Sequence, residues 1–81
     1  MNTYSTRFLA TCPNNGEHIV YDLVIDSTAV IMVEHIVTAT RMIRTGYHET
    51  IADALHKQFG GSQVLMAHHH GVDIKTVRGG A

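Results

Sequence analysis

Two stretches near the N-terminus alternate apolar and polar residues, and the loop between them determines how they pair. Residues 3–12 and 17–26 are rich in β-branched and aromatic residues, and the turn-forming sequence PNNG separates them. A four-residue loop places Cys12 opposite Glu17, so even positions before the loop share a face with odd positions after it. That face carries Phe8, Ala10, Cys12, Ile19, Tyr21, Leu23 and Ile25. The pattern predicts a β-hairpin with one buried face.

The middle of the chain has the periodicity of helices. Over residues 29–45, apolar side chains recur along one stripe with polar residues opposite, and Gly46 is typical of a helix end. The β-branched start of this segment, AVIMV, equally allows a short strand followed by a helix from about Glu34. Residues 47–59 predict a second amphipathic helix, which two glycines follow.

The last segment, residues 62–78, contains the sequence HHHG between two apolar runs. The even positions on either side of it would share a face: Val64, Met66, His68, Val72 and Ile74. A three-residue loop at 69–71 preserves this parity, with glycine at the left-handed position. We therefore expect a second hairpin, in which Val64, Met66 and Ile74 are buried. The alternative is one unbroken strand with a bulge at Gly71.

Together these elements predict one α+β domain over residues 1–81, in the order ββααββ. Two helices would cover one face of an antiparallel sheet, giving two layers. The other face would carry Leu9, Val20, Val24, Leu65, Ala67 and Val77. A solvated sheet face normally alternates to polar residues more cleanly. This apolar face predicts a homo-oligomer, first of all a dimer because two-fold contacts are the commonest.

Composition excludes several classes of function. Six Lys and Arg against seven Asp and Glu give a net charge of −1, which argues against a nucleic-acid partner. The longest apolar run is too short to span a membrane. Cys12 is the single cysteine, which fits a reducing compartment, and no signal-peptide pattern is present. We expect a soluble, cytoplasmic domain.

The histidine triplet is the most chemical stretch of the sequence. His68 and His70 would project to the same side of a continuous strand, a spacing that suits a metal such as zinc. A third ligand could come from one of these residues: His35, His48, His56, Glu49 or Cys12. The rival interpretation, a surface turn with one half-buried histidine, is favoured by the hairpin pattern.

Two other patterns can be weighed in the same way. HET at residues 48–50 begins like the metalloprotease pattern H-E-x-x-H, but Ala52 stands at the second histidine position, which excludes that site. Cys12 could face His68 across the sheet and act as a nucleophile. A buried structural cysteine is the favoured interpretation, because the sequence shows no group that would orient or activate the thiol.

The predicted element order resembles the tunnelling fold of pterin- and purine-binding enzymes, which include the dihydroneopterin aldolases. ETIADAL in the second predicted helix is similar to the E-x-x-A stretch of that family. In the family this glutamate anchors the pterin ring, so the resemblance implies Glu49 as a ligand-binding residue. The lysine–proline pair of the aldolases has no counterpart, since LMAHHHGV stands there, and this departure puts aldolase activity in doubt.

The sequence thus favours a small self-associating domain with a binding or structural role. The alternative is a metal- or small-ligand-binding enzyme whose site forms between subunits around His68, His70 and Glu49. In that alternative, Glu49 and His68 would contact the small-molecule ligand, and His68 and His70 would hold the metal.

Overall fold

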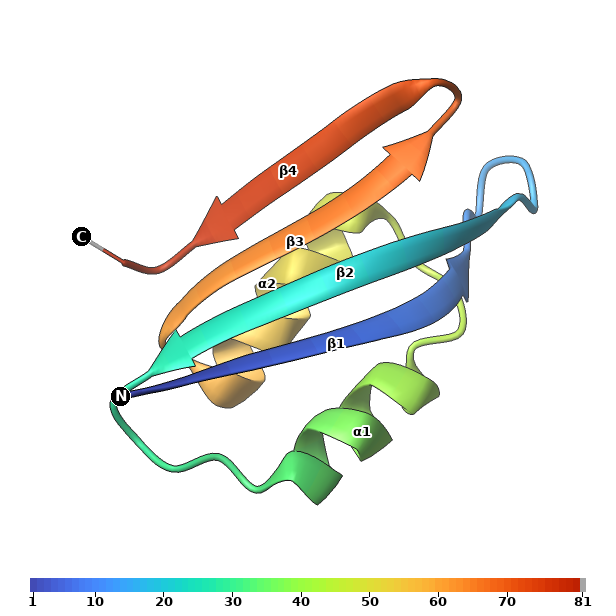
Figure 1. Ribbon diagram of the computed structural model, residues 1–81. Coiled ribbons are helices and arrows are strands. Elements are labelled where there is room, and N and C mark those ends of the chain that lie inside the picture. Colours follow the sequence, from blue (N-terminus) through green and yellow to red (C-terminus); the bar gives the residue numbers. More distant parts are fainter. Residues whose placement is uncertain (81) are drawn as a thin grey trace.

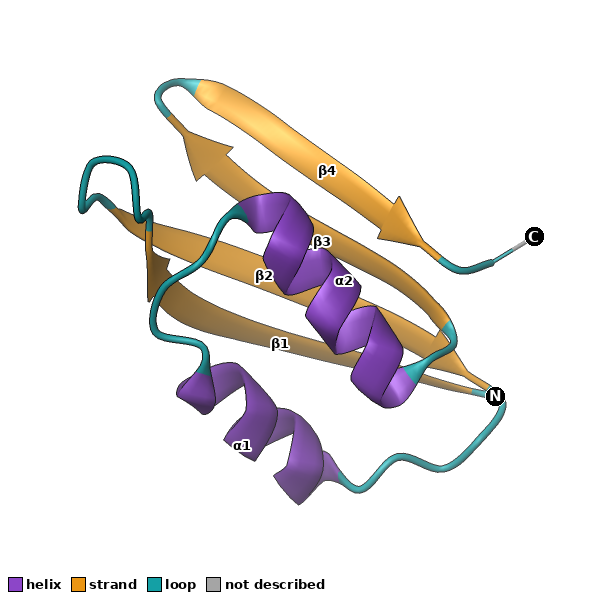
Figure 2. Ribbon diagram, turned by 180° about the vertical axis from the view of Figure 1, so that it is seen from behind, coloured by secondary structure: helices purple, strands orange, loops and turns teal. Residues whose placement is uncertain are grey.

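The computed structural model describes residues 1–80, and it confirms the α+β architecture in the order ββααββ. The elements are β1 (Asn2–Thr11), β2 (His18–Ser27), α1 (Val33–Met42), α2 (His48–Phe59), β3 (Ser62–His69) and β4 (Val72–Arg78). The four strands form one antiparallel sheet in the order β1-β2-β3-β4. Both helices lie on the same face of this sheet (Figures 1 and 2). Two layers result, as the sequence predicts.

The first hairpin has the predicted register. Phe8 pairs with Tyr21 and Ala10 with Ile19, and the backbone N–H of Cys12 donates to the carbonyl of Glu17 at 2.8 Å. The predicted apolar face is buried under the helices, where the rings of Phe8 and Tyr21 stack with centroids 5.2 Å apart. Loop length and alternation were sufficient to place this face.

The second hairpin has a different register from the predicted one. Its turn has two residues, His70 and Gly71, with φ of 51° and 78°, so His69 rather than His68 pairs with Val72. Two consecutive positive φ values are those of the tight turn whose twist matches a hairpin. This shorter loop reverses the parity of β3 relative to β4. The prediction of a three-residue loop and the alternative of an unbroken strand were both wrong.

The reversal exchanges the two faces of β3. Its odd positions, Leu65 and Ala67, are buried under the helices, while Val64 and Met66 lie half-buried on the opposite face. The predicted burial of Val64 and Met66, and the predicted outward position of Leu65 and Ala67, were therefore wrong. Ile74 of β4 pairs with Ala67 and lies on the helix side, as predicted.

Gln63 shows why the face of β3 was misassigned. It is a polar residue with only 3% of its surface exposed. Its side-chain amide donates to the carbonyls of Leu55 at 3.1 Å and Gly60 at 2.8 Å, at the end of α2. These hydrogen bonds offset the cost of burying the amide. Because the next residues are apolar at both parities, a satisfied Gln63 can occupy the inner face.

The helices differ from their predicted limits mainly at the start of α1. This helix begins at Val33 and ends at Met42, whereas residues 29–32 form an irregular loop, neither helix nor strand. The hydroxyl of Ser27 accepts from the N–H of Ala29 at 3.1 Å, and the hydroxyl of Tyr4 accepts from the N–H of Ile31 at 3.1 Å. These contacts satisfy backbone donors without a helical turn. α2 begins one residue later than predicted.

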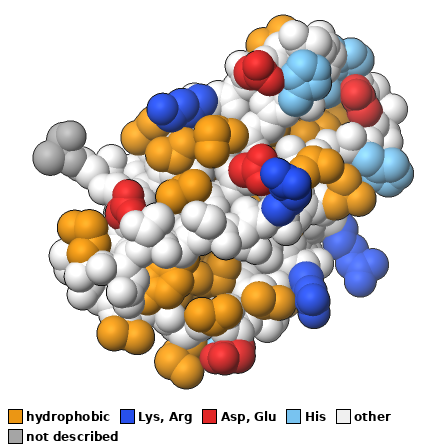
Figure 3. Space-filling view, viewed as in Figure 1, with side chains coloured by type: hydrophobic (Ala, Val, Ile, Leu, Met, Phe, Trp, Pro, Cys, Tyr) orange, Lys and Arg blue, Asp and Glu red, His pale blue; other side chains and the backbone are white. Residues whose placement is uncertain are grey.

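The helix-free face of the sheet is partly apolar (Figure 3). Leu9, Val20 and Val77 are each about half exposed, at 54%, 48% and 55%. An ion pair between Arg7 and Asp22, 2.8 Å apart, crosses the same face on β1 and β2. The predicted apolar outer face is therefore present, with Val64 and Met66 in place of Leu65 and Ala67. Neither helix within residues 1–80 is long and apolar enough to cross a membrane.

Candidate functional site

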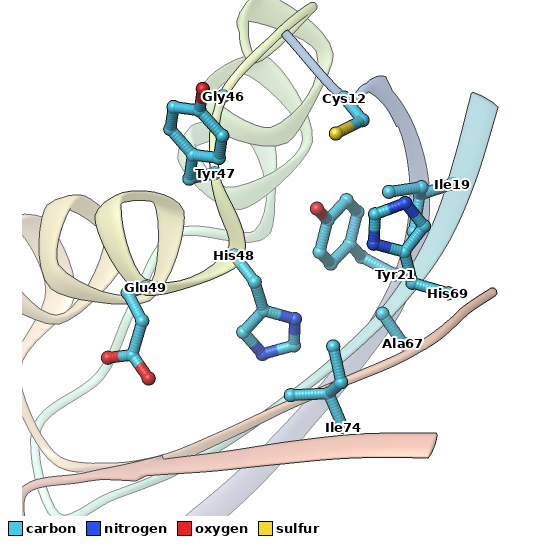
Figure 4. Close-up of a pocket in the computed structure, with 10 residues that line it drawn as sticks. All are labelled: Cys12, Ile19, Tyr21, Gly46, Tyr47, His48, Glu49, Ala67, His69 and Ile74. Carbon is cyan, nitrogen blue, oxygen red and sulfur yellow. The ribbon is translucent and has the colours of Figure 1, made fainter. Parts of the chain in front are cut away.

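A pocket of about 250 Å³ opens beside the N-terminus of α2 (Figure 4). Its apolar surface comes from Ile19, Ala67 and Ile74. The remaining lining residues carry functional groups or lie on the connection to α2: Cys12, Tyr21, Gly46, Tyr47, His48, Glu49 and His69. These residues come from β2, β3, β4, the start of α2 and the two loops that precede β2 and α2.

Backbone hydrogen bonds hold the start of α2 against the end of β1. The N–H of Thr11 donates to the carbonyl of Arg44 at 2.8 Å. The carbonyl of Thr11 accepts from the hydroxyl of Thr45 at 3.0 Å and from the N–H of Gly46 at 3.3 Å. Because Cys12 follows Thr11 directly and His48 follows Gly46 by two residues, this clip brings both side chains to one pocket.

His48 has a defined tautomer in its neutral form. Its Nε2 lies 3.1 Å from the carbonyl oxygen of Leu65, and a carbonyl can only accept, so Nε2 carries the hydrogen. The other nitrogen, Nδ1, is buried and has no hydrogen-bond partner within residues 1–80. Burial lowers the pKa of His48 below its ordinary value of 6.5, against the opposing effects of Leu65 and Glu49. His48 therefore presents a bare acceptor nitrogen at neutral pH.

Cys12 and Tyr21 face the same space from the first hairpin. Figure 4 shows the sulfur of Cys12 and the hydroxyl of Tyr21 directed toward the centre of the pocket. The ring of Tyr21 also packs against that of His48, with centroids 5.4 Å apart. Burial raises the pKa of Tyr21 above its ordinary value, and the neighbouring Cys12 acts in the same direction. The phenol is thus a proton donor at neutral pH.

Glu49, the residue implied by the family resemblance, lies at one end of the pocket in the first turn of α2. Its carboxylate forms an ion pair with Arg78 of β4, which also donates through Nε to Asp53 at 2.7 Å. Hydrogen bonds to Asp53 and then Glu49 raise the pKa of Arg78. A carboxylate at the start of a helix is also favoured by the helix dipole. The ion pair orients the Glu49 carboxylate at the pocket rim.

The structure separates the histidine triplet into three environments. His68 lies exposed on the helix-free face, with Nδ1 2.8 Å from the carboxylate of Asp73. His69 lines the pocket, and its Nε2 is buried and makes no hydrogen bond to any described residue. His70 occupies the turn, with Nε2 2.6 Å from the side-chain nitrogen of Asn15.

His68 and Glu49 are not brought together, because β3 separates them. The metal pair of His68 and His70 stays a prediction, and the cluster of potential ligand atoms in the structure contains His70 with His69 and Glu17 instead. His69 and Tyr21 are the site residues that sequence reasoning missed. The signal for His69 was the His-Gly pair at 70–71, because a two-residue turn directs His69 to the helix side.

The pocket combines groups suited to a small, flat, polar ligand. A carboxylate and a bare imidazole nitrogen can accept from ligand N–H groups, a phenol can donate, and the apolar surface can cover a ring face. A thiol stands among them. The arrangement supports both reversible binding and nucleophilic attack on a bound ligand.

Comparison with known proteins supports the fold. No protein-family model matches the chain, and no curated protein matches it. Among solved structures, the chain is similar to the crystal structure of the archaeosine synthase QueF-Like in the apo form, with a TM-score of 0.74 and 15% sequence identity. The similarity covers 95% of this chain and 89% of that chain. At this identity the similarity establishes a shared fold for the two chains.

Proposed function

We propose that the protein is a self-associating domain that binds a pterin- or purine-like heterocycle in the pocket at the start of α2. The observation that carries the proposal is the bare Nδ1 of His48, buried without a partner among residues 1–80, beside Glu49 in a pocket with an apolar wall. An unsatisfied buried acceptor is costly unless a donor such as a ligand N–H or an ordered water reaches it. Two similarities support a pterin- or purine-like ligand. One is the sequence resemblance to the tunnelling fold, and the other is the shared fold with the archaeosine synthase.

Glu49 would be the main anchor of such a ring. Guanine-like and pterin-like rings have a ring N–H next to an amino group, and a carboxylate can accept from both in parallel. The ion pair with Arg78 limits the rotation of the carboxylate. Tyr47, which is 57% exposed at the pocket edge, offers an aromatic surface on which the ring could stack.

A second copy of the chain would complete the site. The pocket is open in one chain, while the sheet presents an apolar face and, within residues 1–80, two edge strands, β1 and β4. Association through the face or the edges would remove apolar surface from water at about 25 cal/mol per Å². Association at the β4 edge, where Ile74 lines the pocket, would also cover the open side of the pocket, whereas the helix-free face lies on the opposite side of the sheet.

The test is whether the protein binds guanine or pterin. Calorimetry measures the binding of both rings, and fluorescence also measures the binding of pterin. The wild-type protein should bind at least one of them saturably. Glu49→Gln should weaken that binding by roughly 10-fold or more, since a charge-assisted contact becomes a neutral one. Glu34→Gln is the matched control, because Glu34 occupies the first turn of α1. Equal affinity in the Glu49 and Glu34 variants, or binding of neither ring, would contradict the proposal.

A second candidate function is catalysis with Cys12 as the nucleophile. Its thiol lies in the same pocket as His48, whose Nδ1 can accept the thiol proton as sulfur adds to an electrophilic carbon of the bound ligand. The test is alkylation of the folded protein by iodoacetamide. If iodoacetamide modifies Cys12 in the folded protein, and guanine or pterin slows that modification, the result would support this role. A thiol that reacts only in denaturant would be a structural cysteine.

A further inference from the structure

The loops of the two hairpins meet at one end of the sheet and bring three metal-ligating side chains together. Glu17 ends the loop between β1 and β2, whereas His69 and His70 lie at the turn between β3 and β4. One ligand atom from each of the three lies within 4.8 Å of the others. The cluster is tertiary, because more than fifty positions of sequence separate Glu17 from the histidines.

The two distances from Glu17 to the histidines are longer than strong hydrogen bonds and match the spacing between two ligands of one metal ion. Oε2 of Glu17 lies 3.4 Å from Nε2 of His69 and 3.3 Å from Nε2 of His70. Charge-assisted hydrogen bonds between such atoms are about 2.7–2.9 Å long. Two ligands bound tetrahedrally at about 2.0–2.1 Å from a zinc ion stand about 3.3 Å apart. Both measured separations agree with that edge.

The hydrogen-bond pattern around His70 shows that its Nε2 carries no hydrogen. The side-chain oxygen of Asn15 accepts from the N–H of Glu17 at 3.0 Å, so the amide nitrogen of Asn15 points to His70. An amide nitrogen can only donate, and Nε2 of His70 must therefore present a lone pair. In the metal-free chain this lone pair accepts from Asn15, and it becomes available to a metal when that hydrogen bond is released.

His69 supplies a second imidazole nitrogen. Its Nε2 is buried and makes no hydrogen bond to any residue in the range 1–80, although the carboxylate of Glu17 is near. The ring centroids of His69 and His70 lie 4.4 Å apart, and Nε2 of each lies within 3.4 Å of Oε2 of Glu17.

We propose that Glu17, His69 and His70 bind a divalent transition-metal ion of the zinc class, with a fourth coordination position open. Two imidazoles and one carboxylate are the donor set of many zinc sites that keep an exchangeable position. On binding, His70 transfers its lone pair from Asn15 to the metal, while Asn15 remains bonded to the N–H of Glu17. His69 also lines the pocket, so the metal would stand at the pocket rim. The proposal does not depend on the identity of the pocket ligand.

The test is titration of metal-free, untagged protein with Zn²⁺ against a chromophoric chelator, and with Co²⁺ for its visible spectrum. We expect one ion per chain and the intense visible bands of tetrahedral Co²⁺. His69→Ala and Glu17→Gln should each weaken binding by roughly 100-fold or more, because loss of a direct ligand exceeds the effect of losing its supporting contacts. Glu17→Gln preserves the shape of an exposed side chain, so it tests the site without disturbing the core.

His68→Ala is the matched control, since His68 belongs to the same triplet but points to the opposite face. It should bind Zn²⁺ as the wild type does. Loss of binding in His68→Ala with retention in His69→Ala would overturn the proposal in favour of the pair at 68 and 70. Weak, octahedral Co²⁺ binding that no variant changes would also overturn it. The metal titrations are independent of guanine or pterin binding, which the Glu49→Gln variant tests. Failure of the metal proposal can therefore be distinguished from failure of the proposed function.

Discussion

At the scale of residues, the candidate site is defined by polar atoms that the fold buries without satisfying. His48 and His69 each keep a buried ring nitrogen with no hydrogen bond to residues 1–80, while the amide nitrogen of buried Gln63 donates to two carbonyls. The family resemblance implies Glu49 as a ligand-binding residue, and Glu49 lines the pocket. The resemblance could not predict His69, because the direction of that side chain depends on a turn with two positive φ values.

The burial of His48 predicts a pH dependence of stability. Its pKa lies below 6.5 in the folded state, so the unfolded chain takes up the proton first as the pH falls. The free energy of unfolding should keep this contribution above about pH 6.5 and lose it progressively below that value. Urea denaturation at about pH 7.5 and about pH 5.5 measures the loss.

Replacement of His48 isolates its share of this dependence. His48→Gln can still donate to the carbonyl of Leu65 but does not titrate, so its urea midpoint should fall less on acidification than that of the wild type. His35→Gln, on the exposed surface of α1, should leave the wild-type dependence unchanged. An identical fall in both variants would show that burial of His48 is not its cause.

At the scale of elements, the two hairpins differ in how much the sequence determines. β1 and β2 alternate clearly, and a four-residue loop at PNNG gives their observed register, so both strands were placed correctly. Val64, Leu65, Met66 and Ala67 are apolar at both parities, so alternation along β3 favours neither face. Turn length then decides the register, and the choice between two and three residues was not encoded in the apolar pattern.

Gln63 provides a direct test of the register of β3. Gln63→Ala would leave the carbonyls of Leu55 and Gly60 without their side-chain donor, which should lower the free energy of unfolding by about 1–3 kcal/mol. Gln58→Ala, exposed on α2, should change it by less than about 0.5 kcal/mol. Chemical denaturation compares the two. Equal, negligible effects of the two substitutions would mean that Gln63 faces solvent, as the predicted three-residue loop between β3 and β4 required.

At the scale of the whole molecule, the apolar outer face is the feature that one chain alone does not explain. Its composition was predicted almost correctly although β3 was reversed, because that strand contributes apolar residues to either face. Leu9, Val20 and Val77 remain about half exposed. Soluble monomers rarely expose a contiguous apolar patch larger than a few hundred Å². We propose that a second copy of the chain covers this face.

Charge placed on this face should weaken self-association through it. Val20→Lys introduces an ammonium group at a position 48% exposed in the single chain, where a packed partner would desolvate it. Val30→Lys, 81% exposed in the loop before α1, is the control. Size-exclusion chromatography with light scattering should show a lower mass for the Val20 variant alone. Unchanged association in both would place the contact at the sheet edges instead.

The central claim is that the functional unit contains more than one copy of the chain, and the mass of the untagged protein tests it most directly. Sedimentation equilibrium at micromolar concentration should give at least twice the chain mass of 8.9 kDa, with guanine or pterin shifting the equilibrium further toward the assembly. A mass of 8.9 kDa, unchanged by either ring, would contradict the account.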